Sequence, residues 1–415
     1  MNISKLNYQV RSYMSYKGQK SDRDYYKILF NKISKEILFK HDYYNLQLLY
    51  DSFKNYPNCN ILTFDEVDFY NAVEFEFMLN LVNDTKQINT LKFKAINLHN
   101  YVNELVKFIK NNHTIKSISF NQSGINNEDL KLLCKAMKEN DTLTTLDLSS
   151  NNTFSNVEPI CNLIQNNTNI TTLYFNNVYN CDFIPLIETL KTNNSIKKIK
   201  IYESSIKIFD SFWNMLKINN SINHVSFRSS YNIDMLKIKE VLTVNKTITE
   251  LSLYNANTDD WKPLIELLKT NNILTYINLN NCRINDYKQF YEIIKNNSNI
   301  KVLKLNHYLI YNNNDYIDND IDVLIDALEH NKTIEKLFVY GINVINPAKY
   351  LKTIINHPSL KEINAEIDRK YTEEVWKAIY NEENLIDIGY QPTICYTKIF
   401  NTTDKNKYFR QFVYV

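Results

Sequence analysis

Few residues of this 415-residue chain have the type and spacing needed for catalysis. His224 and Ser226 lie two residues apart, which would place them on the same face of a strand. A hydrolytic triad also needs a carboxylate, and the sequence offers none at a fitting position. His307 and His330 have no metal-ligand partners at helical spacing, so these histidines are interpreted as rim or surface residues. We therefore expect no catalytic residue and no enzyme activity.

Metal and nucleotide sites are not predicted either. The acidic run from Asp315 to Asp322 has neither the Gly at the turn nor the closing bidentate Glu of a calcium loop, which favours a solvated loop. The six cysteines lie far apart, without a C-x-x-C pair or zinc-ligand spacing, and are interpreted as core residues in a reducing compartment. The four glycines form no phosphate-binding spacing. We expect no metal, no cofactor and no small-molecule substrate.

Aromatic and Arg side chains indicate a binding surface instead. Tyr202, Arg228 and Tyr254 follow one another at intervals of 26 residues, so they occupy the same position in consecutive copies of a repeated segment. Side chains of these types dominate the binding energy at protein interfaces. The chain contains 30 Tyr, so the row is more informative than any single Tyr. The candidate partner-binding residues are Tyr174, Tyr202, Arg228, Tyr254, Phe338 and Tyr340.

The overall charge does not indicate a nucleic-acid or membrane partner. The formal net charge is +2, from 48 Lys and Arg against 46 Asp and Glu, and the two signs are interspersed. The first 20 residues are polar and no apolar run reaches bilayer length, so a cytoplasmic, intracellular protein is expected. Local clusters of lysine are interpreted as solvated, or as matched to an acidic partner: Lys197, Lys198, Lys200, Lys301 and Lys304.

The candidate residues would be positioned by a short strand that recurs along the chain. Apolar residues at its positions 1, 4 and 6 return in twelve copies, whose starts are 25 to 28 residues apart except for one interval of 34. A further, incomplete copy has Ile61 and Phe64 but Glu66 in third place. The twelve copies begin at Ile88, Ile115, Leu143, Ile170, Ile196, Ile222, Ile248, Leu274, Ile300, Ile334, Leu360 and Leu385.

A helix is predicted between successive strands. Apolar residues with offsets of 0, 3, 4 and 7, as in the segment from Phe183 to Leu190, lie on one helical face. In the long interval this face reappears from Ile321 to Leu328 after a shift of eight residues. The insertion is therefore placed at residues 306–320, in a strand-to-helix loop.

Each predicted helix ends at a polar turn that contains Asn. At turns such as those of Asn193, Asn219 and Asn245, the Asn is expected to take the left-handed conformation of a helix cap. Several of these turns read as N-x-S/T sequons, which we interpret as a consequence of the repeated turn and not as glycosylation sites.

The repeats must stack in order to fold. About seven apolar side chains per repeat, at about 2 kcal/mol each, do not offset an ordering cost of about 1.5 kcal/mol per residue. Neighbouring repeats are therefore expected to bury each other's apolar faces and to pair their strands. The predicted fold class is α/β, a right-handed solenoid (horseshoe) with a parallel β-sheet on the concave side and α-helices on the convex side, because helices need more room than strands.

The repeat resembles the leucine-rich repeat of the ribonuclease-inhibitor type, which has a full helix per repeat. The resemblance covers about three-quarters of the chain. The Asn or Cys that this family carries at position 9 is present as Asn151 and Cys282 and is replaced at Val178, Ala256 and Ile342. The resemblance implies a leucine-rich-repeat solenoid that binds proteins with its concave sheet and adjoining loops. Some members of the family regulate small GTPases or bind actin ends.

The two ends are expected to cover the repeat array, which spans residues 59–390. Residues 1–58 lack the repeat, have helical stretches around 25–39 and 46–53, and are interpreted as a helical N-terminal cap. Residues 391–415 are predicted to form a C-terminal cap.

The function expected from the sequence is that of a non-enzymatic scaffold that binds a protein partner through the concave face and rim loops. One alternative is a substrate receptor of a ubiquitin ligase, because Ile33–Leu38 resembles the opening of an F-box, although the Leu-Pro that begins that motif is absent. A second alternative is a small-GTPase regulator of the leucine-rich-repeat type, which rests on the family resemblance alone.

Overall fold

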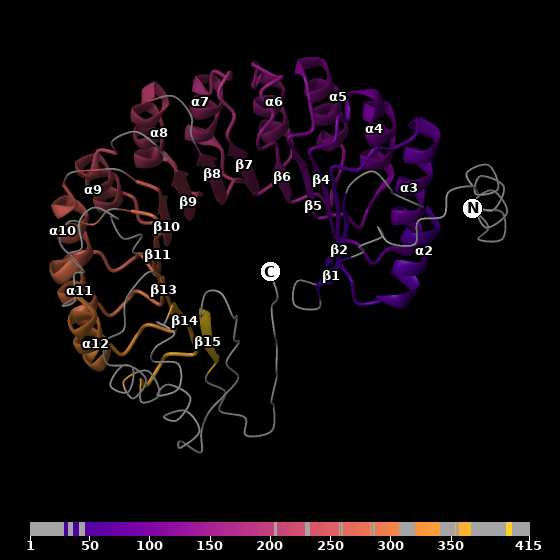
Figure 1. The fold of residues 1–415 in the computed structure, drawn as a ribbon. Helices are drawn as coiled ribbons and strands as arrows, with labels where there is room; N and C mark the ends of the chain where they lie inside the picture. The colour runs from indigo at the N-terminus through magenta and orange to yellow at the C-terminus, as the bar shows by residue number, and fades with distance from the viewer. Residues whose placement is uncertain are drawn as a thin grey trace, which may run out of the picture. The chain divides into compact units, whose positions relative to one another are not determined.

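The computed structural model describes residues 29–31, 36–40, 46–202, 206–228, 233–256, 258, 260–282, 284, 287–306, 320–340, 353, 357–366 and 396–400. The chain forms two compact units, Met1–Lys200 and Ile201–Val415, which are called the N-terminal and C-terminal units. Both units are built from alternating strands and helices (Figure 1).

The N-terminal unit is a layer of strands with a layer of helices on one face (Figure 1). Its strands pair in chain order and are parallel from β2 to β7. The strands are β1 (Leu29–Asn31), β2 (Glu36–Lys40), β3 (Ile61–Asp65), β4 (Thr90–Lys94), β5 (Ser117–Asn121), β6 (Thr145–Asp147) and β7 (Thr172–Asn176), and β8 (Lys198–Tyr202) lies at the division between the units. The helices are α2 (Leu46–Asn55), α3 (Ala72–Thr85), the 3-10 helix η1 (His99–Tyr101), α4 (Val102–Asn111), α5 (Asn127–Lys138), α6 (Glu158–Asn166) and α7 (Ile184–Thr192).

The C-terminal unit continues the same alternation. Strands β9 to β14 form a parallel sheet in which each strand pairs with the next one along the chain, and β15 pairs with β14 in the antiparallel direction. The strands are β9 (His224–Arg228), β10 (Glu250–Tyr254), β11 (Tyr276–Leu279), β12 (Val302–Asn306), β13 (Lys336–Tyr340), β14 (Glu362–Glu366) and β15 (Tyr396–Phe400). The helices are α8 (Ile206–Ile218), α9 (Met235–Val244), α10 (Lys262–Thr270), α11 (Tyr287–Asn296) and α12 (Asp320–His330).

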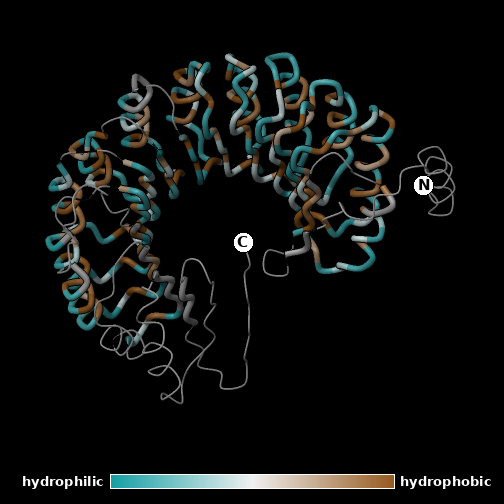
Figure 2. The backbone as a smooth tube through the Cα atoms, in the orientation of Figure 1, coloured by the Kyte–Doolittle hydropathy of each residue, from teal (hydrophilic) through white to brown (hydrophobic). Residues whose placement is uncertain are grey.

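The predicted apolar positions return to the same depth from repeat to repeat. Leu91, Ile118 and Leu146 lie opposite one another in adjacent strands, and all three are buried. Hydrophobic and hydrophilic positions alternate along the strands and helices (Figure 2). The predicted α/β solenoid with a parallel sheet is thus confirmed within each unit, where the strands lie on the inner side of an arc and the helices on its outer side (Figure 1).

A column of phenylalanine rings runs through the core of the N-terminal unit. Phe39 and Phe64 have ring centroids 5.6 Å apart, and Phe64 and Phe93 have centroids 5.9 Å apart. Phe93 and Phe120 continue the column at 6.3 Å, with planes only 4° from parallel. Each such pair adds about 0.5–1.5 kcal/mol beyond the burial of apolar area. The column therefore joins the strands β2 to β5 of four consecutive repeats.

The predicted helical faces are buried. In α7 and the residue before it, the segment from Phe183 to Leu190 places all four of its periodic apolar residues in the core. Leu324, Ile325 and Leu328 of α12 are buried as well, which confirms the shift of eight residues that followed the insertion. Residues 307–319 of the insertion itself lie outside the described residues, and so does His307.

The incomplete copy around Ile61 and Phe64 does form a strand, β3, but in a register that the sequence analysis missed. Strand β3 places Leu62 opposite Leu91 and Phe64 opposite Phe93, so Cys59 occupies position 1 of this repeat. Cys59 is buried, as Ile and Leu are at this position elsewhere. Glu66 is therefore not a failed apolar position. It lies in the turn after the strand, with a φ of 57°.

The expected helix over residues 25–39 is wrong where the structure describes this segment, because residues 36–40 form the strand β2. Ile37 and Phe39 alternate into the core and pair with β3, which outweighs any local helical preference. Strand β1 pairs antiparallel with β2, and β15 does the same with β14. Both parallel arrays therefore end in an antiparallel strand, which covers their open hydrogen-bonding edge. The predicted helix over 46–53 is confirmed as α2.

The Asn residues at the helix ends do not take the predicted left-handed conformation. Asn193 and Asn245 have extended backbones, with φ of −71° and −70°. Most of the described left-handed residues follow the strands instead, as at Ala95 and Gln122, both with a φ of 53°, whereas Lys86 takes this conformation at the end of α3. The reason is that the Asn side chain, and not its backbone, forms the connection at the turn.

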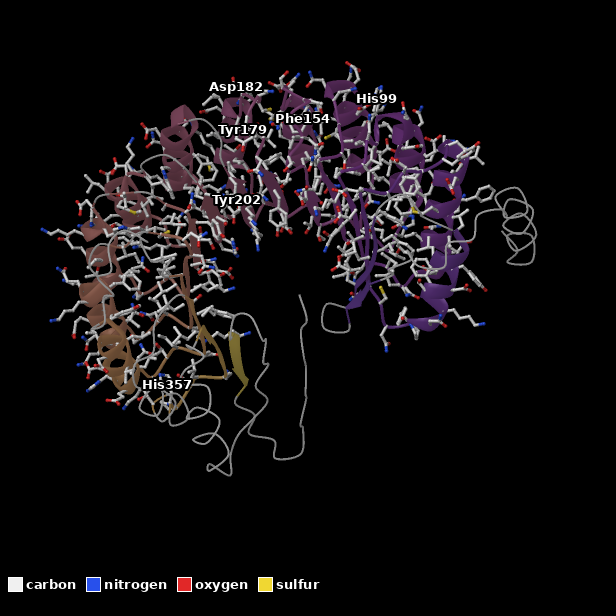
Figure 3. The ribbon with its side chains drawn as sticks, in the orientation of Figure 1. His99, Phe154, Tyr179, Asp182, Tyr202 and His357 are labelled. Atoms are coloured by element: carbon white, nitrogen blue, oxygen red, sulfur yellow. The ribbon has the colours of Figure 1, made fainter. Side chains whose placement is uncertain are left out.

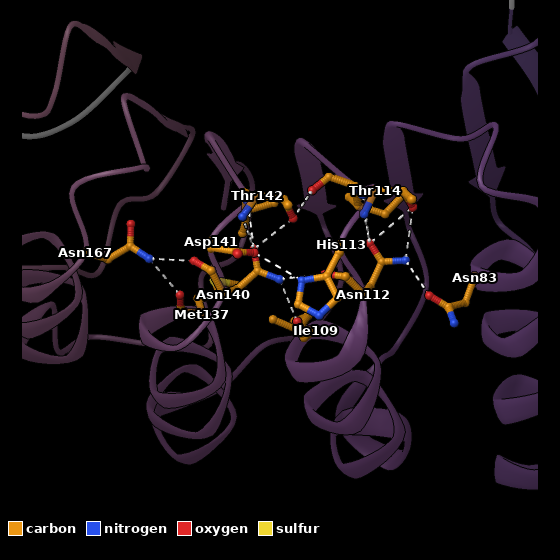
Figure 4. Close-up of polar contacts among 12 residues, drawn as sticks. Asn83, Ile109, Asn112, His113, Thr114, Met137, Asn140, Asp141, Thr142 and Asn167 are labelled. Carbon is orange, nitrogen blue, oxygen red and sulfur yellow. Dashed lines mark hydrogen bonds and ion pairs between the residues drawn. The ribbon is translucent and has the colours of Figure 1, made fainter.

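Each Asn amide joins two successive repeats, in an arrangement called the asparagine ladder (Figure 4). The Asn140 Nδ2 donates to the carbonyl oxygens of Ile109, at 2.7 Å, and Asn112, at 2.9 Å, in the preceding repeat. Its Oδ1 accepts from the backbone N–H groups of Thr142 and Leu143, in its own turn. An Asn Nδ2 also donates to a carbonyl of the preceding repeat at Asn167, Asn193, Asn245, Asn271, Asn297 and Asn331. At the equivalent positions, Asn112 donates to the Asn83 side chain and the Asn219 Oδ1 accepts within its own turn.

Polar residues at position 9 of the repeat form a second set of hydrogen bonds between neighbouring repeats. Asn151 accepts from the backbone N–H of Ser123, at 2.9 Å, and donates to the carbonyl of Phe120. The Cys282 thiol donates to the carbonyl of Leu253 at 3.1 Å. Val178 and Ala256 are buried and apolar at this position, so the link is irregular along the chain. Ile342 lies outside the described residues, as do the repeat predicted at Leu385 and most of the predicted C-terminal cap.

Candidate functional site

The candidate site lies on the face of the sheet that no described helix covers, called the inner face. Along each strand, side chains on this face alternate with the buried residues. In the C-terminal unit, Arg228 of β9 lies opposite Tyr254 of β10, and Lys304 of β12 lies opposite Phe338 of β13. Neighbouring inner-face residues are thus one strand spacing apart, about 4.8 Å.

The sequence-predicted row of Tyr202, Arg228 and Tyr254 is brought together in the C-terminal unit. The rings of Tyr202 and Tyr254 stack with centroids 6.2 Å apart and planes at 19°. The Arg228 Cζ lies 5.5 Å from the centroid of the Tyr254 ring, at the distance of a cation–π contact. The Asn281 Nδ2 donates to the Tyr254 hydroxyl at 3.1 Å. This group of three residues is called the tyrosine–arginine cluster, and Figure 3 shows Tyr202 on the inner side.

Lys304 lies between two aromatic rings of the same face. Its Nζ is 4.3 Å from the ring centroid of Phe338 and 5.7 Å from that of Tyr276. Burial raises the pKa of the Tyr276 hydroxyl, while bonds to Asn278 and Ser252 act in the opposite direction. Phe338, one of the predicted residues, thus lies on the inner face beside Lys304, and Tyr276 lies there too although the sequence analysis did not single it out. For Tyr340 the structure describes only the backbone, which lies opposite Asn306.

Tyr174, the remaining predicted residue, belongs to the N-terminal unit. Its ring lies 5.8 Å from Lys198 Nζ and 5.9 Å from Lys200 Nζ. Elsewhere on the described inner face of this unit, several charged groups have polar partners within the protein. Lys92 Nζ lies 3.1 Å from the Glu36 carboxylate, and other pairs are Lys94 with Asp65 and Ser119 with Asp147.

A carboxylate does lie beside His224, contrary to the sequence analysis. Glu250 occupies the opposite position on β10, and its Oε2 contacts His224 Nδ1. The strand register that creates this pair is visible only once the repeats are aligned. Ser226, the hydroxyl considered with His224, is 4% exposed, and its Oγ lies 3.2 Å from the Tyr202 hydroxyl. A substrate therefore has almost no access to this serine.

A second His–carboxylate pair was also missed, between η1 and the start of α5 in the N-terminal unit. His99 Nδ1 lies 3.0 Å from an oxygen of Asp129, which is buried. Asp129 belongs to a capping box, since Asn126 accepts from its backbone N–H and it accepts from that of Asn126. This spacing of Asn and Asp at the start of α5 was readable from the sequence. His330, by contrast, is an exposed residue that contacts Asp326 of its own helix.

The cysteines described by the structure are all buried with free thiols: Cys59, Cys134, Cys161, Cys181 and Cys282. Burial raises the pKa of Cys181 and of Cys282 to about 12, and it raises that of Cys134 further. The reactive thiolate is therefore strongly disfavoured. Among the described side chains, no group of three or more His, Cys, Asp or Glu could hold a metal ion. No helix in the described part of the chain combines the length and the hydrophobicity that crossing a bilayer requires.

Comparison with known proteins gives little further information. No protein-family model matches the chain, and no curated protein matches it. Among solved structures, 97 chains match. One of them, actin-binding site 2 of leiomodin-1, is 19% identical and has a TM-score of 0.25. That match covers 40% of this chain and 87% of the other.

Proposed function

We propose that this protein is a non-enzymatic scaffold that binds a protein partner, and that the inner face of its C-terminal unit carries the main contacts. The tyrosine–arginine cluster is the observation that carries the proposal. Tyr and Arg contribute most to binding energy at interfaces. Here the rings and the guanidinium already support one another, so less side-chain freedom is lost when a partner binds.

The proposal includes the repeat type, which we infer to be the leucine-rich repeat of the ribonuclease-inhibitor kind. The helices that the structure describes between strands support it, with lengths from 9 residues in α6 to 14 in α3. The inter-repeat bonds of Asn151 and Cys282 at position 9 support it as well. Nothing in the described residues favours the F-box-like or the GTPase-regulator alternative, and both stay predictions from the sequence.

The test replaces the cluster and follows a partner. Partners of the full-length chain are identified by affinity purification and mass spectrometry, and one of them is purified for titration. The triple variant Tyr202→Ala, Arg228→Ala, Tyr254→Ala is expected to weaken its binding at least about tenfold, since hot-spot truncations cost about 2 kcal/mol or more. A matched variant, Tyr70→Ala, Tyr179→Ala, Lys269→Ala, changes exposed residues away from the inner face and is expected to bind normally.

Circular dichroism and thermal melting separate binding from folding. The triple variant loses one aromatic stack, one cation–π contact and the hydrogen bonds of the Tyr202 and Tyr254 hydroxyls, so a loss of stability of about 2–4 kcal/mol is expected, without loss of secondary structure. Unchanged affinity in a folded triple variant would show that the partner binds elsewhere.

A further inference from the structure

We infer that the buried asparagines of this fold are incompatible with N-glycosylation, so that the chain folds only where its N-x-S/T sequons stay unmodified. The inference does not depend on the proposed function, because it concerns where the chain can fold and therefore which partners it can meet. It starts from six sequons in the described part of the chain whose Asn, at a helix-to-strand turn or at position 9, is only 1% to 4% exposed. These residues are Asn112, Asn140, Asn151, Asn219, Asn245 and Asn331.

In three of these sequons, both hydrogens of the side-chain nitrogen are donated to the preceding repeat. An Asn Nδ2 carries two hydrogens. The Asn245 Nδ2 donates to the carbonyl of Leu216, at 2.8 Å, and to that of Asn219, at 2.9 Å. Asn331 makes the same two kinds of bond, and so does Asn140 (Figure 4). The nitrogen that a glycan would modify therefore lies between two repeats.

N-glycosylation changes this nitrogen covalently. It joins Nδ2 to C1 of a sugar that is delivered on a lipid diphosphate. The bond from C1 to the diphosphate oxygen breaks, and Nδ2 loses one hydrogen as a proton. One N–H group then remains for two buried carbonyls, and a buried acceptor without a donor is unfavourable. The closely packed interior also has no room for the sugar. A chain modified at one of these residues therefore cannot form the turn.

Two other sequons lack these constraints and provide an internal comparison. Asn166 and Asn296 are exposed, and they are the last residues of α6 and α11. The Nδ2 of each donates to a carbonyl of its own helix, that of Asn162 at 2.8 Å and that of Glu292 at 3.1 Å. A glycan on either nitrogen would extend into solvent without breaking a bond between repeats. The fold therefore tolerates a glycan at Asn166 and Asn296.

Burial in the folded protein does not protect the other sequons. Glycans are attached to the chain as it enters the secretory pathway, before the turns between repeats have formed. We therefore expect the chain to fold only on the side of the membrane where N-glycosylation does not take place. A partner of the inner face is expected on the same side.

The first experiment sends the natural full-length chain into the secretory pathway of cultured mammalian cells with an added signal peptide. Tunicamycin, which blocks synthesis of the lipid-linked sugar, is expected to raise secretion of folded chain at least about tenfold, because chains that cannot fold are retained and degraded. Resistance to trypsin, compared with that of the chain made in bacteria, reports folding. Trypsin-resistant chain secreted equally well without the inhibitor would overturn the inference. An equally low yield with and without it would do the same, because another cause would then prevent folding.

A pair of single-sequon chains tests the position of the glycan. In both chains all sequons but one are removed, by Pro at the second residue or Ala at the third. The turn chain keeps the sequon of Asn245, and the matched control keeps that of Asn296. In the control, Lys246→Pro leaves Asn245 in place, since its φ of −70° and ψ of 129° are favourable before Pro.

Both single-sequon chains are expected to carry one glycan, but only the control is expected to be secreted in a trypsin-resistant form. The turn chain is expected at a level at least about tenfold lower. Equal secretion of the two folded chains would show that the turn accommodates the glycan or forms before it is attached, and either result would overturn the inference. If neither chain folds when it is made in bacteria, the experiment with the natural chain decides.

Discussion

Asn245 illustrates how much one buried side chain contributes at the residue scale. It is 3% exposed, its Nδ2 donates to Leu216 and Asn219, and its Oδ1 accepts from Thr247 and Ile248. Replacement by Ala leaves two carbonyls and two N–H groups without these partners. Each buried group left unsatisfied costs about 1–3 kcal/mol, partly relieved when water enters. We therefore expect Asn245→Ala to lower the free energy of unfolding by about 2–4 kcal/mol, measured by urea denaturation.

The control for this prediction is Asn166→Ala. Asn166 also starts an N-x-S/T sequon, but it is exposed and its amide donates only to the Asn162 carbonyl of its own helix. A change within about 0.5 kcal/mol is expected, as for most surface substitutions. Equal effects of the two substitutions would contradict a structural role for the asparagine ladder.

The ladder also explains the sequons that the sequence analysis attributed to a repeated turn. In the turn of Asn245, the Thr247 hydroxyl donates to the Ile222 carbonyl of the preceding repeat at 2.9 Å. The Asn and the Thr of the motif therefore each bind the preceding repeat, which buries the Asn and fixes the spacing. The sequence predicted that these positions matter for the turn. It did not predict how, because a left-handed cap and an amide bridge both favour Asn.

At the scale of elements, His357 shows what happens where the Asn is replaced. Its Nδ1 lies 3.1 Å from the backbone nitrogen of Leu360 and 3.3 Å from that of Ser359, so it accepts as the Asn Oδ1 does. Only the neutral ring can accept at Nδ1. Burial lowers the pKa of His357 below 6.5, and the backbone of Asn331 offsets part of this shift. Figure 3 shows His357 in the turn before β14.

Because the pKa of His357 is lower in the folded chain than in the unfolded chain, the direction in which its contribution to stability changes with pH is determined. The unfolded chain binds the proton more readily, so the contribution of His357 to stability is complete above a pH of about 6.5 and is lost as the pH falls toward the folded pKa. We expect the wild type to be less stable at about pH 5.5 than at about pH 7.5, and His357→Asn to remove part of this difference. Urea denaturation at both pH values measures it.

The matched control is His113→Asn. His113 and its partner Asp141 are both exposed, and Figure 4 draws their contact beside the ladder. Because His113 bridges no buried groups, its replacement is expected to leave the pH dependence of stability as in the wild type. If the His357→Asn protein shows the same difference in stability between the two pH values as the wild type, other groups cause the pH dependence.

The elements were predictable where the repeat is regular and not where a single residue departs from it. Leu91 and Phe93 identify β4 at once, whereas Cys59 in the equivalent of Ile88 led to a register two residues too late in β3. Strand β2 was missed because only Ile37 and Phe39 mark it, and pairing with β3 determines its conformation. Tyr202, Arg228 and Tyr254 share one repeat position in the sequence, and so do His224 and Glu250, which are also 26 residues apart. The pairing of His224 with Glu250 was therefore readable from the repeat, although the sequence analysis missed it.

For the molecule as a whole, stability is expected to come from contacts between neighbouring repeats. Strand pairing, the asparagine ladder and the buried apolar residues all join a repeat to the next one in sequence. In such a stack, a substitution that destabilises one repeat weakens the contacts with its two neighbours most, and its effect on stability decreases with distance along the array. The buried cysteines, which are spread over both units, report on this packing without any mutation.

We predict that at most one of the six thiols reacts quickly in the folded protein. Cys395 lies outside the described residues, and the other five are buried. With a pKa of about 12 at Cys181 and Cys282, only about one thiol in ten thousand would be ionised at a pH near 8. Ellman's reagent should therefore count no more than one fast thiol in native buffer and six in guanidinium chloride. Because the five described thiols are buried and the reagent cannot reach them in the folded protein, moderate alkalinity should not raise the native count. Two or more fast thiols in native buffer would show that the apolar layers between repeats open without denaturant.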